Sequence, residues 1–125
     1  AVVVDNTSHF RLEPGVPLVV AGVNDNALGG HTGIVANPNC STAQLMPVLK
    51  ALDQAFTLKR VIVSTYQSVS GAGKKGLDAL SASIEEATNG NDAVHAPFQR
   101  AIGYNLIPHI DVFLTEGPLT GYTKE

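Results

Sequence analysis

At residues 33–42 the chain reads Gly33-Ile34-Val35-Ala36-Asn37-Pro38-Asn39-Cys40-Ser41-Thr42. The first four residues form a short apolar run typical of a buried strand, and Asn37-Pro38-Asn39 is a strong turn signal. After the turn, apolar residues recur at i, i+4, i+7 and i+11, which is one face of an amphipathic helix. These residues are Leu45, Leu49, Leu52 and Phe56. The stretch therefore predicts a strand, a tight turn and a helix that begins near Cys40, with Ser41 and Thr42 as its caps.

Cys40 is the only cysteine among the 125 residues. At the start of a helix, a thiol lies near the positive end of the helix dipole and near backbone N–H groups, and both favour the thiolate form. Free cysteine is also among the most often buried residue types, so a buried structural role is an equally good interpretation of the local sequence. A single cysteine excludes an internal disulfide framework and a thiolate metal cluster.

The rest of the chain alternates strand and helix signals. We expect short buried strands at 2–4 and 18–20, a loop at 23–33, a longer strand at 59–68 and a helix at 73–88. Leu77, Leu80 and Ile84 would form the apolar stripe of that second helix, and Asn89-Gly90 would end it. Pro47 should kink the first helix or mark an early turn. We expect residues 90–104 to be irregular and 106–114 to be a broken apolar segment.

Composition narrows the classes of function. The net charge of −3 argues against a nucleic-acid-binding protein, which would normally carry a basic excess. No apolar run reaches membrane-spanning length and no leader opens the chain, so we expect a cytoplasmic protein without a membrane partner. The histidines show no metal-ligand spacing, so we expect no metal. They are His9, His31, His95 and His109. Both ends look cut, which suggests an internal segment of a larger enzyme.

Ordered blocks along nearly the whole chain match one enzyme family. Besides residues 33–42 they are Val4-Asp5-Asn6-Thr7-Ser8-His9-Phe10-Arg11, Val16-Pro17-Leu18-Val19-Val20, Lys59-Arg60-Val61-Ile62-Val63-Ser64-Thr65-Tyr66-Gln67-Ser68-Val69-Ser70-Gly71-Ala72-Gly73 and Tyr104-Asn105-Leu106-Ile107-Pro108-His109-Ile110-Asp111. In this order they closely resemble aspartate-β-semialdehyde dehydrogenase. The resemblance implies NADP-dependent interconversion of aspartyl phosphate with aspartate 4-semialdehyde and phosphate, a step toward lysine, threonine, methionine and diaminopimelate.

The resemblance also implies a fold and an assembly. The fold is α/β (α+β), in which residues 1–36 are the last strands of a Rossmann-type NADP domain. Residues 37–125 then begin an α+β catalytic and dimerisation domain. The whole enzyme would be a homodimer or homotetramer, and the remaining fragments of the same enzyme are its expected partners. The family's acid/base histidine falls in a later motif, so none of the histidines here is assigned that role.

By the resemblance, Cys40 is the nucleophile that forms an acyl-thioester. Arg11 would bind phosphate, because a planar guanidinium suits two-pronged binding of an oxyanion. A lone arginine in such a block is otherwise usually a solvated charge. Gln67 and Asn39 would bind substrate, Asn39 as an amide donor to the developing oxyanion. A plain turn residue is an equally good interpretation of Asn39.

The cofactor contacts are expected at Ser70 and Gly71, in a small-residue loop that opens a helix, and at Asn6. The glycine fingerprint for the cofactor diphosphate is absent from this sequence. Ala21-Gly22 stands where the family usually has a glutamate before Val-Asn. Two other functions stay open. One is another thioester acyl-phosphate reductase, such as N-acetyl-γ-glutamyl-phosphate reductase, although its usual Pro-Gly-Cys-Tyr run is not the one found here. The other is an inactive fragment or assembly module.

Overall fold

The computed structural model describes residues 1–108 and Thr115. The described chain divides into two compact units, one formed by residues 1–63 together with Thr115 and one formed by residues 64–108. The end of the predicted apolar segment, residues 109–114, lies outside the described residues, as do His109 and Asp111 of the family block.

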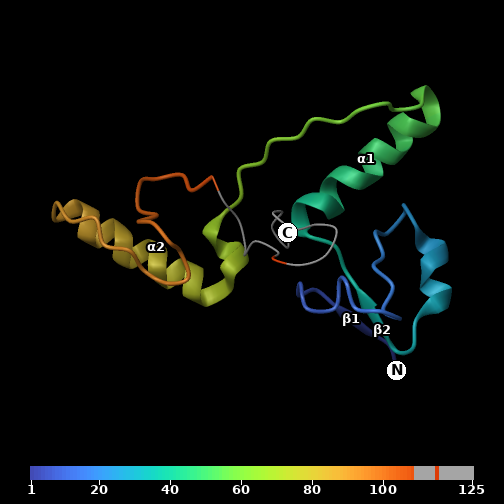
Figure 1. Cartoon of the computed structure of the whole chain (residues 1–125), viewed down its shortest axis with the longest axis horizontal. Coiled ribbons are helices and arrows are strands. Elements are labelled where there is room, and N and C mark those ends of the chain that lie inside the picture. The colour runs from blue at the N-terminus through green and yellow to red at the C-terminus, as the bar shows by residue number, and fades with distance from the viewer. Residues whose placement is uncertain (109–114, 116–125) are drawn as a thin grey trace. The chain divides into compact units, whose positions relative to one another are not determined.

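The first unit is built on a pair of parallel strands, β1 (Val3–Asp5) and β2 (Ile34–Ala36). Their register places Val3 opposite Ile34 and Asp5 opposite Ala36. Figure 1 shows the two strands side by side, with α1 (Cys40–Phe56) following β2. Leu18 forms a parallel bridge to Ala36, so β2 lies between two neighbours. This position buries β2, and Val35 and Ala36 are only 4% and 0% exposed.

Two strand predictions in this unit are confirmed and two other predictions need correction. The strands expected at 2–4 and 33–36 are present, each shifted by at most one residue. The strand expected at 18–20 is reduced to the single bridge at Leu18. The loop expected at 23–33 contains a 3₁₀-helix, η1 (Asp25–Gly30). Two side chains stabilise the turn at residues 20–25 that leads into η1. Asn24 Oδ1 accepts from the Val20 amide at 2.7 Å, and Asp25 Oδ1 accepts from the Gly22 amide at 2.8 Å.

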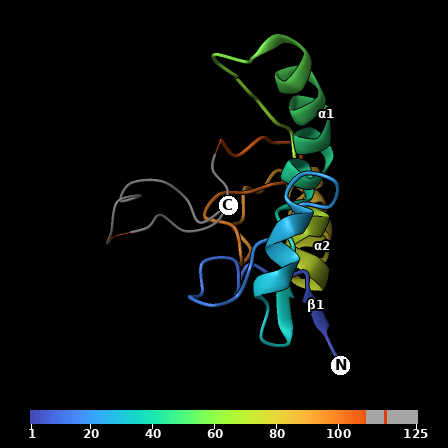
Figure 2. The same ribbon diagram turned by 90° about the vertical axis from the view of Figure 1, so that its right-hand side faces the viewer.

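The helix predicted to follow Cys40 is α1 (Cys40–Phe56). Its N-cap is Asn39, whose side chain accepts from the Ser41 amide, so the prediction of Ser41 and Thr42 as caps is wrong. Pro47 lies inside the helix, and α1 remains continuous over its whole length in both views (Figures 1 and 2). Thr57 ends it in the left-handed conformation with φ of 55°. The predicted apolar face is present in sequence, but no α1 residue is buried among the described residues.

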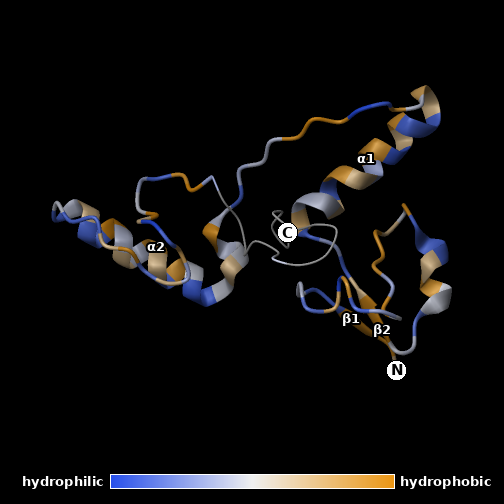
Figure 3. Ribbon diagram, in the orientation of Figure 1, coloured by the Kyte–Doolittle hydropathy of each residue, from blue (hydrophilic) through white to orange (hydrophobic). Residues whose placement is uncertain are grey.

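The strand predicted at 59–68 is not formed. A strand is stabilised by hydrogen bonds to a neighbouring strand, and the described residues provide none at this position. The segment includes the apolar run 61–63 that suggested a strand, and Figure 3 shows an apolar run after a hydrophilic stretch in the chain that follows α1. Its large side chains are exposed, with Ile62 at 78% and Tyr66 at 85%.

The second unit contains a 3₁₀-turn, η2 (Val69–Ala72), and the predicted helix α2 (Gly73–Thr88). The predicted apolar stripe is only partly correct, because Leu77 is 49% exposed while the buried residues are Gly76, Ala79 and Ser83. Small residues are needed on this face, since backbone approaches it closely. A Cβ on Gly76 would lie 2.2 Å from the carbonyl oxygen of Val69. The Gly103 amide donates to Ser83 Oγ at 2.8 Å.

Residues 89–104 follow as predicted, without helix or strand. Within the described part of the chain, no helix combines the length and apolar character needed to cross a membrane.

Candidate functional site

Cys40 is the first residue of α1 and is exposed. The interpretation as a buried structural cysteine is therefore wrong for the described chain. Asn39 orders the turn in front of the thiol, because its Oδ1 accepts from the Ser41 amide at 2.9 Å and also from the Ser41 hydroxyl. Cys40 Sγ lies 4.0 Å from the same Oδ1. The thiol is thus held on a well-defined turn at the start of a helix of 17 residues.

Arg11 is bonded to the same turn. Its Nε donates to the carbonyl oxygen of Asn37 at 3.0 Å, and the residue is half-buried. The two residues are 26 positions apart in sequence. Arg11 is therefore not the freely solvated charge that a lone arginine usually is, and the structure brings it to the segment that leads into Cys40.

Asn6 meets the turn from the end of β1. Its Oδ1 accepts from Asn37 Nδ2 at 2.7 Å. Because the carboxyl ends of parallel strands lie at one edge of a sheet, β1 and β2 deliver Asn6 and Asn37 to the same place. Four of the predicted site residues, Asn6, Arg11, Asn39 and Cys40, are thus gathered around one turn.

The segment that carries Arg11 is folded by its own side chains. Asp5 Oδ1 accepts from the Thr7 amide at 3.0 Å and from the Thr7 hydroxyl at 2.7 Å. Thr7 Oγ1 in turn accepts from the His9 amide at 3.2 Å. Short side chains that bond to nearby backbone amides stabilise turns, and here they direct the chain from β1 back to Asn37.

Asn37 is the residue that the sequence analysis missed as part of the site. An asparagine before a proline is a common turn residue, and a turn alone accounts for its presence in the sequence. The structure shows that Asn37 contacts both Asn6 and Arg11. The one local signal was its position directly after the most buried strand.

The other three predicted residues belong to the second unit. Gln67 is exposed, and its Oε1 accepts from the Thr65 hydroxyl at 3.1 Å. Ser70 and Gly71 lie in η2, not in the plain loop that was expected. Their amides bond to Ser68, at 3.3 Å to its Oγ and at 3.2 Å to its carbonyl oxygen. Both residues are exposed, and a Cβ placed on Gly71 would meet no atom within 4 Å, so the surface at η2 is open.

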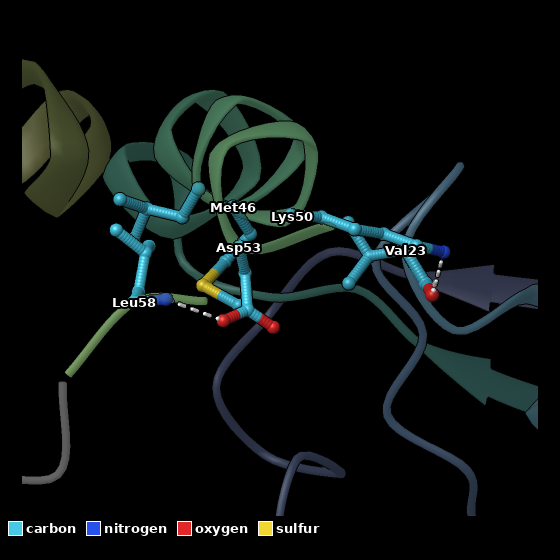
Figure 4. A pocket seen from close by; sticks show the side chains of 6 residues that line it. Val23, Met46, Lys50, Asp53 and Leu58 are labelled. Carbon is cyan, nitrogen blue, oxygen red and sulfur yellow. Dashed lines mark hydrogen bonds between the residues drawn. The ribbon is translucent and has the colours of Figure 1, made fainter. Parts of the chain in front are cut away.

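The first unit also has a hollow of about 400 Å³, shown in Figure 4, which includes none of the predicted site residues. It lies against the middle and end of α1 and is lined by Val23, Met46, Leu49, Lys50, Asp53 and Leu58. Both charged side chains of the wall are used within the fold. Lys50 Nζ donates to the carbonyl oxygens of Gly22 and Val23 at 3.1 and 2.5 Å, and Asp53 Oδ1 accepts from the Leu58 amide at 2.9 Å. The hollow is therefore a packing feature between α1 and the loop at 22–23.

Residues 1–108 and Thr115 contain no group of three or more His, Cys, Asp or Glu side chains arranged to hold a metal ion. The chemistry available at the turn is that of an exposed thiol, a guanidinium and three amides.

Comparison with known proteins identifies the class. The sequence model of the semialdehyde dehydrogenase dimerisation domain matches residues 49–124. The chain belongs to the semialdehyde dehydrogenase family. Within that family its similar relatives are named aspartate-semialdehyde dehydrogenase, which confirms the resemblance drawn from the sequence blocks. The relative from Campylobacter jejuni is 50% identical over 129 residues, and the one from Vibrio mimicus is 46% identical over 126.

The same comparisons show how much of each relative the chain represents. The alignments with these two relatives cover 100% and 99% of this chain, but only 36% and 39% of the relatives' own lengths. A crystal structure of aspartate semialdehyde dehydrogenase II from Vibrio cholerae, complexed with ASA, matches with a TM-score of 0.82 and 46% identity. That match covers 98% of this chain and 36% of the solved one. The likeness confirms the α/β character of the fold. The chain spans about a third of the length of the relatives it matches.

Proposed function

We propose that this chain supplies the nucleophile and the phosphate-binding arginine of an NADP-dependent aspartate-semialdehyde dehydrogenase. The observation that carries the proposal is the turn at residues 37–40. It presents an exposed thiol at a helix start and is hydrogen-bonded to Arg11. The names of the relatives support this reaction over that of another thioester acyl-phosphate reductase.

In the oxidising direction, the Cys40 thiolate adds to the aldehyde carbon of aspartate 4-semialdehyde, the carbonyl oxygen takes up a proton, and a thiohemiacetal forms. NADP, when bound, supplies the acceptor for the hydride that leaves this carbon. The hydroxyl proton is lost in the same step, and the product on Cys40 is a thioester. Phosphate then attacks the thioester carbon, the C–S bond breaks, and Cys40 leaves as the thiolate while aspartyl phosphate departs. Covalent catalysis of this kind divides one difficult step into easier ones, and a thiolate is a good nucleophile near neutral pH.

The other residues of the turn have roles that fit their positions. Arg11 would hold the phosphate, because a guanidinium binds an oxyanion through parallel N–H donors. Asn39 would donate from Nδ2 to the oxygen that becomes negative when Cys40 adds. Such a donor is worth about 3–4 kcal/mol of transition-state stabilisation where the role is real. We assign Gln67 to the substrate, whose carboxylate or carbonyl an uncharged amide can bind.

The residues assigned to the cofactor are Ser70, Gly71 and Asn6. The open, small-residue surface at η2 fits a planar ring or an amide of a nucleotide, since no side chain obstructs an approach to Gly71. The Ser70 hydroxyl is the polar group there, and it is exposed and hydrogen-bonded to Ser68 Oγ at 3.1 Å. Asn6 is already bonded to Asn37, so any contact to the cofactor would come from its remaining polar capacity.

We further propose the domain division and assembly of the family for the whole enzyme. Residues 1–36 would complete a Rossmann-type nucleotide domain, and residues 37–125 would begin the catalytic and dimerisation domain. The match of residues 49–124 to the dimerisation domain supports a homo-oligomer, which we propose to be a homodimer or homotetramer. The exposed apolar side chains Ile62 and Tyr66 are consistent with burial against further protein. The cytoplasm is the proposed location.

A chimera tests the function directly. The third of the Vibrio cholerae enzyme that matches this chain is replaced by these 125 residues, and NADPH formation is measured with aspartate 4-semialdehyde and phosphate. We expect turnover, and a loss of at least about a thousandfold in the Cys40→Ser variant. The isolated chain should not turn over, because it lacks the diphosphate-binding glycines and the family's base.

The result that would overturn the proposal is a Cys40→Ser chimera that is folded and still active. Folding is checked by the melting temperature and the elution volume of each variant against the parent. A preference for N-acetylglutamate semialdehyde would instead support the alternative reductase. A folded chimera that is inactive with both aldehydes would support the inactive-module interpretation.

A further inference from the structure

We propose that Asn37 is a positioning residue that fixes the Arg11 guanidinium and the Cys40 turn relative to each other. The proposal rests on the proposed function where it concerns phosphate and the thiol. The geometry itself does not depend on that function.

All three polar groups of Asn37 that can hold the turn are hydrogen-bonded. Its backbone N–H donates to the carbonyl oxygen of Asp5 at 2.8 Å, which continues the β1–β2 ladder one residue beyond Ala36. Its carbonyl oxygen accepts from Arg11 Nε at 3.0 Å. Its side-chain Nδ2 donates to Asn6 Oδ1 at 2.7 Å. One residue thus joins the end of β1, the arginine and the start of the nucleophile turn.

The chain between Asn37 and Cys40 transmits this position. Pro38 is buried and its ring fixes φ near about −65°. Asn39 is fixed in turn by its bonds to the amide and hydroxyl of Ser41. Few free torsions therefore remain between Asn37 and the thiol, and a displacement of Asn37 would carry Cys40 with it.

The hydrogen bond from Arg11 Nε to the Asn37 carbonyl oxygen determines the orientation of the Arg11 guanidinium. A guanidinium is planar, so an acceptor at Nε constrains the plane in which the terminal nitrogens lie. Two-pronged binding of phosphate depends on that plane more than on charge alone. Asn37 would therefore orient the fork of Arg11 and hold it at a set distance from the nucleophile.

The side-chain bond to Asn6 can be removed from either end. In the full-length enzyme, Asn37→Ala and Asn6→Ala each delete this bond and keep the backbone groups of residue 37, which then lose the side-chain contact that fixes their position and so hold Arg11 Nε less firmly. Because misplacement by about 1 Å can cost up to about a hundredfold, we expect each variant to raise the Michaelis constant for phosphate about tenfold. The double variant should be no worse than either single one, since both remove the same contact.

If Asn37 only stabilised the fold, Asn37→Ala would lower the melting temperature without changing the Michaelis constant for phosphate. The matched control is Asn91→Ala, which removes another exposed amide contact, from Asn91 Nδ2 to Glu86 Oε2 at 3.0 Å. We expect it to leave the phosphate constant within about twofold of the parent, the change expected of a surface contact outside the site. The kcat of folded enzyme should fall less in the Asn37→Ala variant than the phosphate constant rises.

A second readout does not require activity. Exchange of the Arg11 Nε–H with water, followed by NMR on enzyme with ¹⁵N-labelled arginine, should become several-fold faster in the Asn37→Ala variant. If the parent enzyme shows no turnover, the proposed function fails, and this exchange rate alone decides the positioning role. Unchanged exchange, or an unchanged phosphate constant in a folded and active variant, would overturn the role of Asn37.

Discussion

The two interpretations of Asn39 can be separated by a pair of substitutions. As N-cap of α1, Asn39 uses Oδ1 to accept from the Ser41 amide, and this role requires only an acceptor. As an oxyanion donor, it needs Nδ2, the one donor group of the side chain. Asn39→Ser retains an uncharged capping oxygen but loses the amide. Asn39→Ala loses both.

The two roles of Asn39 predict clearly different changes in melting temperature and in kcat. Loss of an N-cap costs about 1 kcal/mol of stability, so in an enzyme of this size Asn39→Ala should melt about 1–2 °C below the parent and Asn39→Ser close to it. If Asn39 is an oxyanion donor, both variants should lose about 10²–10³ in kcat, because loss of one such donor costs about 3–4 kcal/mol.

The assay is steady-state turnover of the full-length enzyme in the aldehyde-oxidising direction, with melting temperatures measured on the same preparations. Alkylation of Cys40 is measured in parallel, so that a damaged nucleophile is not taken for a lost donor. If the folded Asn39→Ser variant keeps a kcat within about threefold of the parent, where loss of a donor costs 10²–10³, Asn39 is a helix cap and nothing more.

The remaining predictions concern the arginine and the thiol. Arg11→Lys keeps the charge but removes Nε and its bond to Asn37, so the Michaelis constant for phosphate should rise about tenfold. Arg100→Lys, at an exposed position, is the control, and equal constants in both would return Arg11 to the solvated surface. Iodoacetamide should label Cys40 at the start of α1 at least about tenfold faster than the thiol of a Ser81→Cys variant, which lies exposed in the middle of α2. Similar rates would argue against an activated nucleophile.

The sequence predicted those elements whose hydrogen bonds are local. The sequence predicts the start of α1 and both bounds of α2, since each helical bond joins residues four positions apart and the 3.6-residue period is visible within one segment. The segment 59–68 has the composition of a strand, yet a strand forms only beside another strand. Its prediction therefore depended on residues outside the segment. The stripe of α2 is only partly correct for a related reason, because η2 and Gly103 decide which face is covered, and they require small residues.

Candidate site residues could be proposed from the sequence, but their contacts could not. Cys40 and Arg11 were singled out from motif blocks, and no local pattern says that Arg11 reaches Asn37 across 26 positions. Asn37 was hidden because turn formation already explained an asparagine before a proline. Where one residue serves both a turn and a site, the sequence signal of the turn masks that of the site.

Strand register connects these observations. Asp5 pairs with Ala36, so the next residue of each strand, Asn6 and Asn37, meet at the sheet edge although they are 31 positions apart. A shift of one residue would turn each side chain of β1 to the opposite face and separate the two amides. Because Leu18 pairs with Ala36 on the other side, β2 is held by two neighbours, and such a shift would break both pairings. The position of the thiol is therefore determined first by the pairing of β2 and only then by the helix that follows, since α1 has no buried residue of its own among those described.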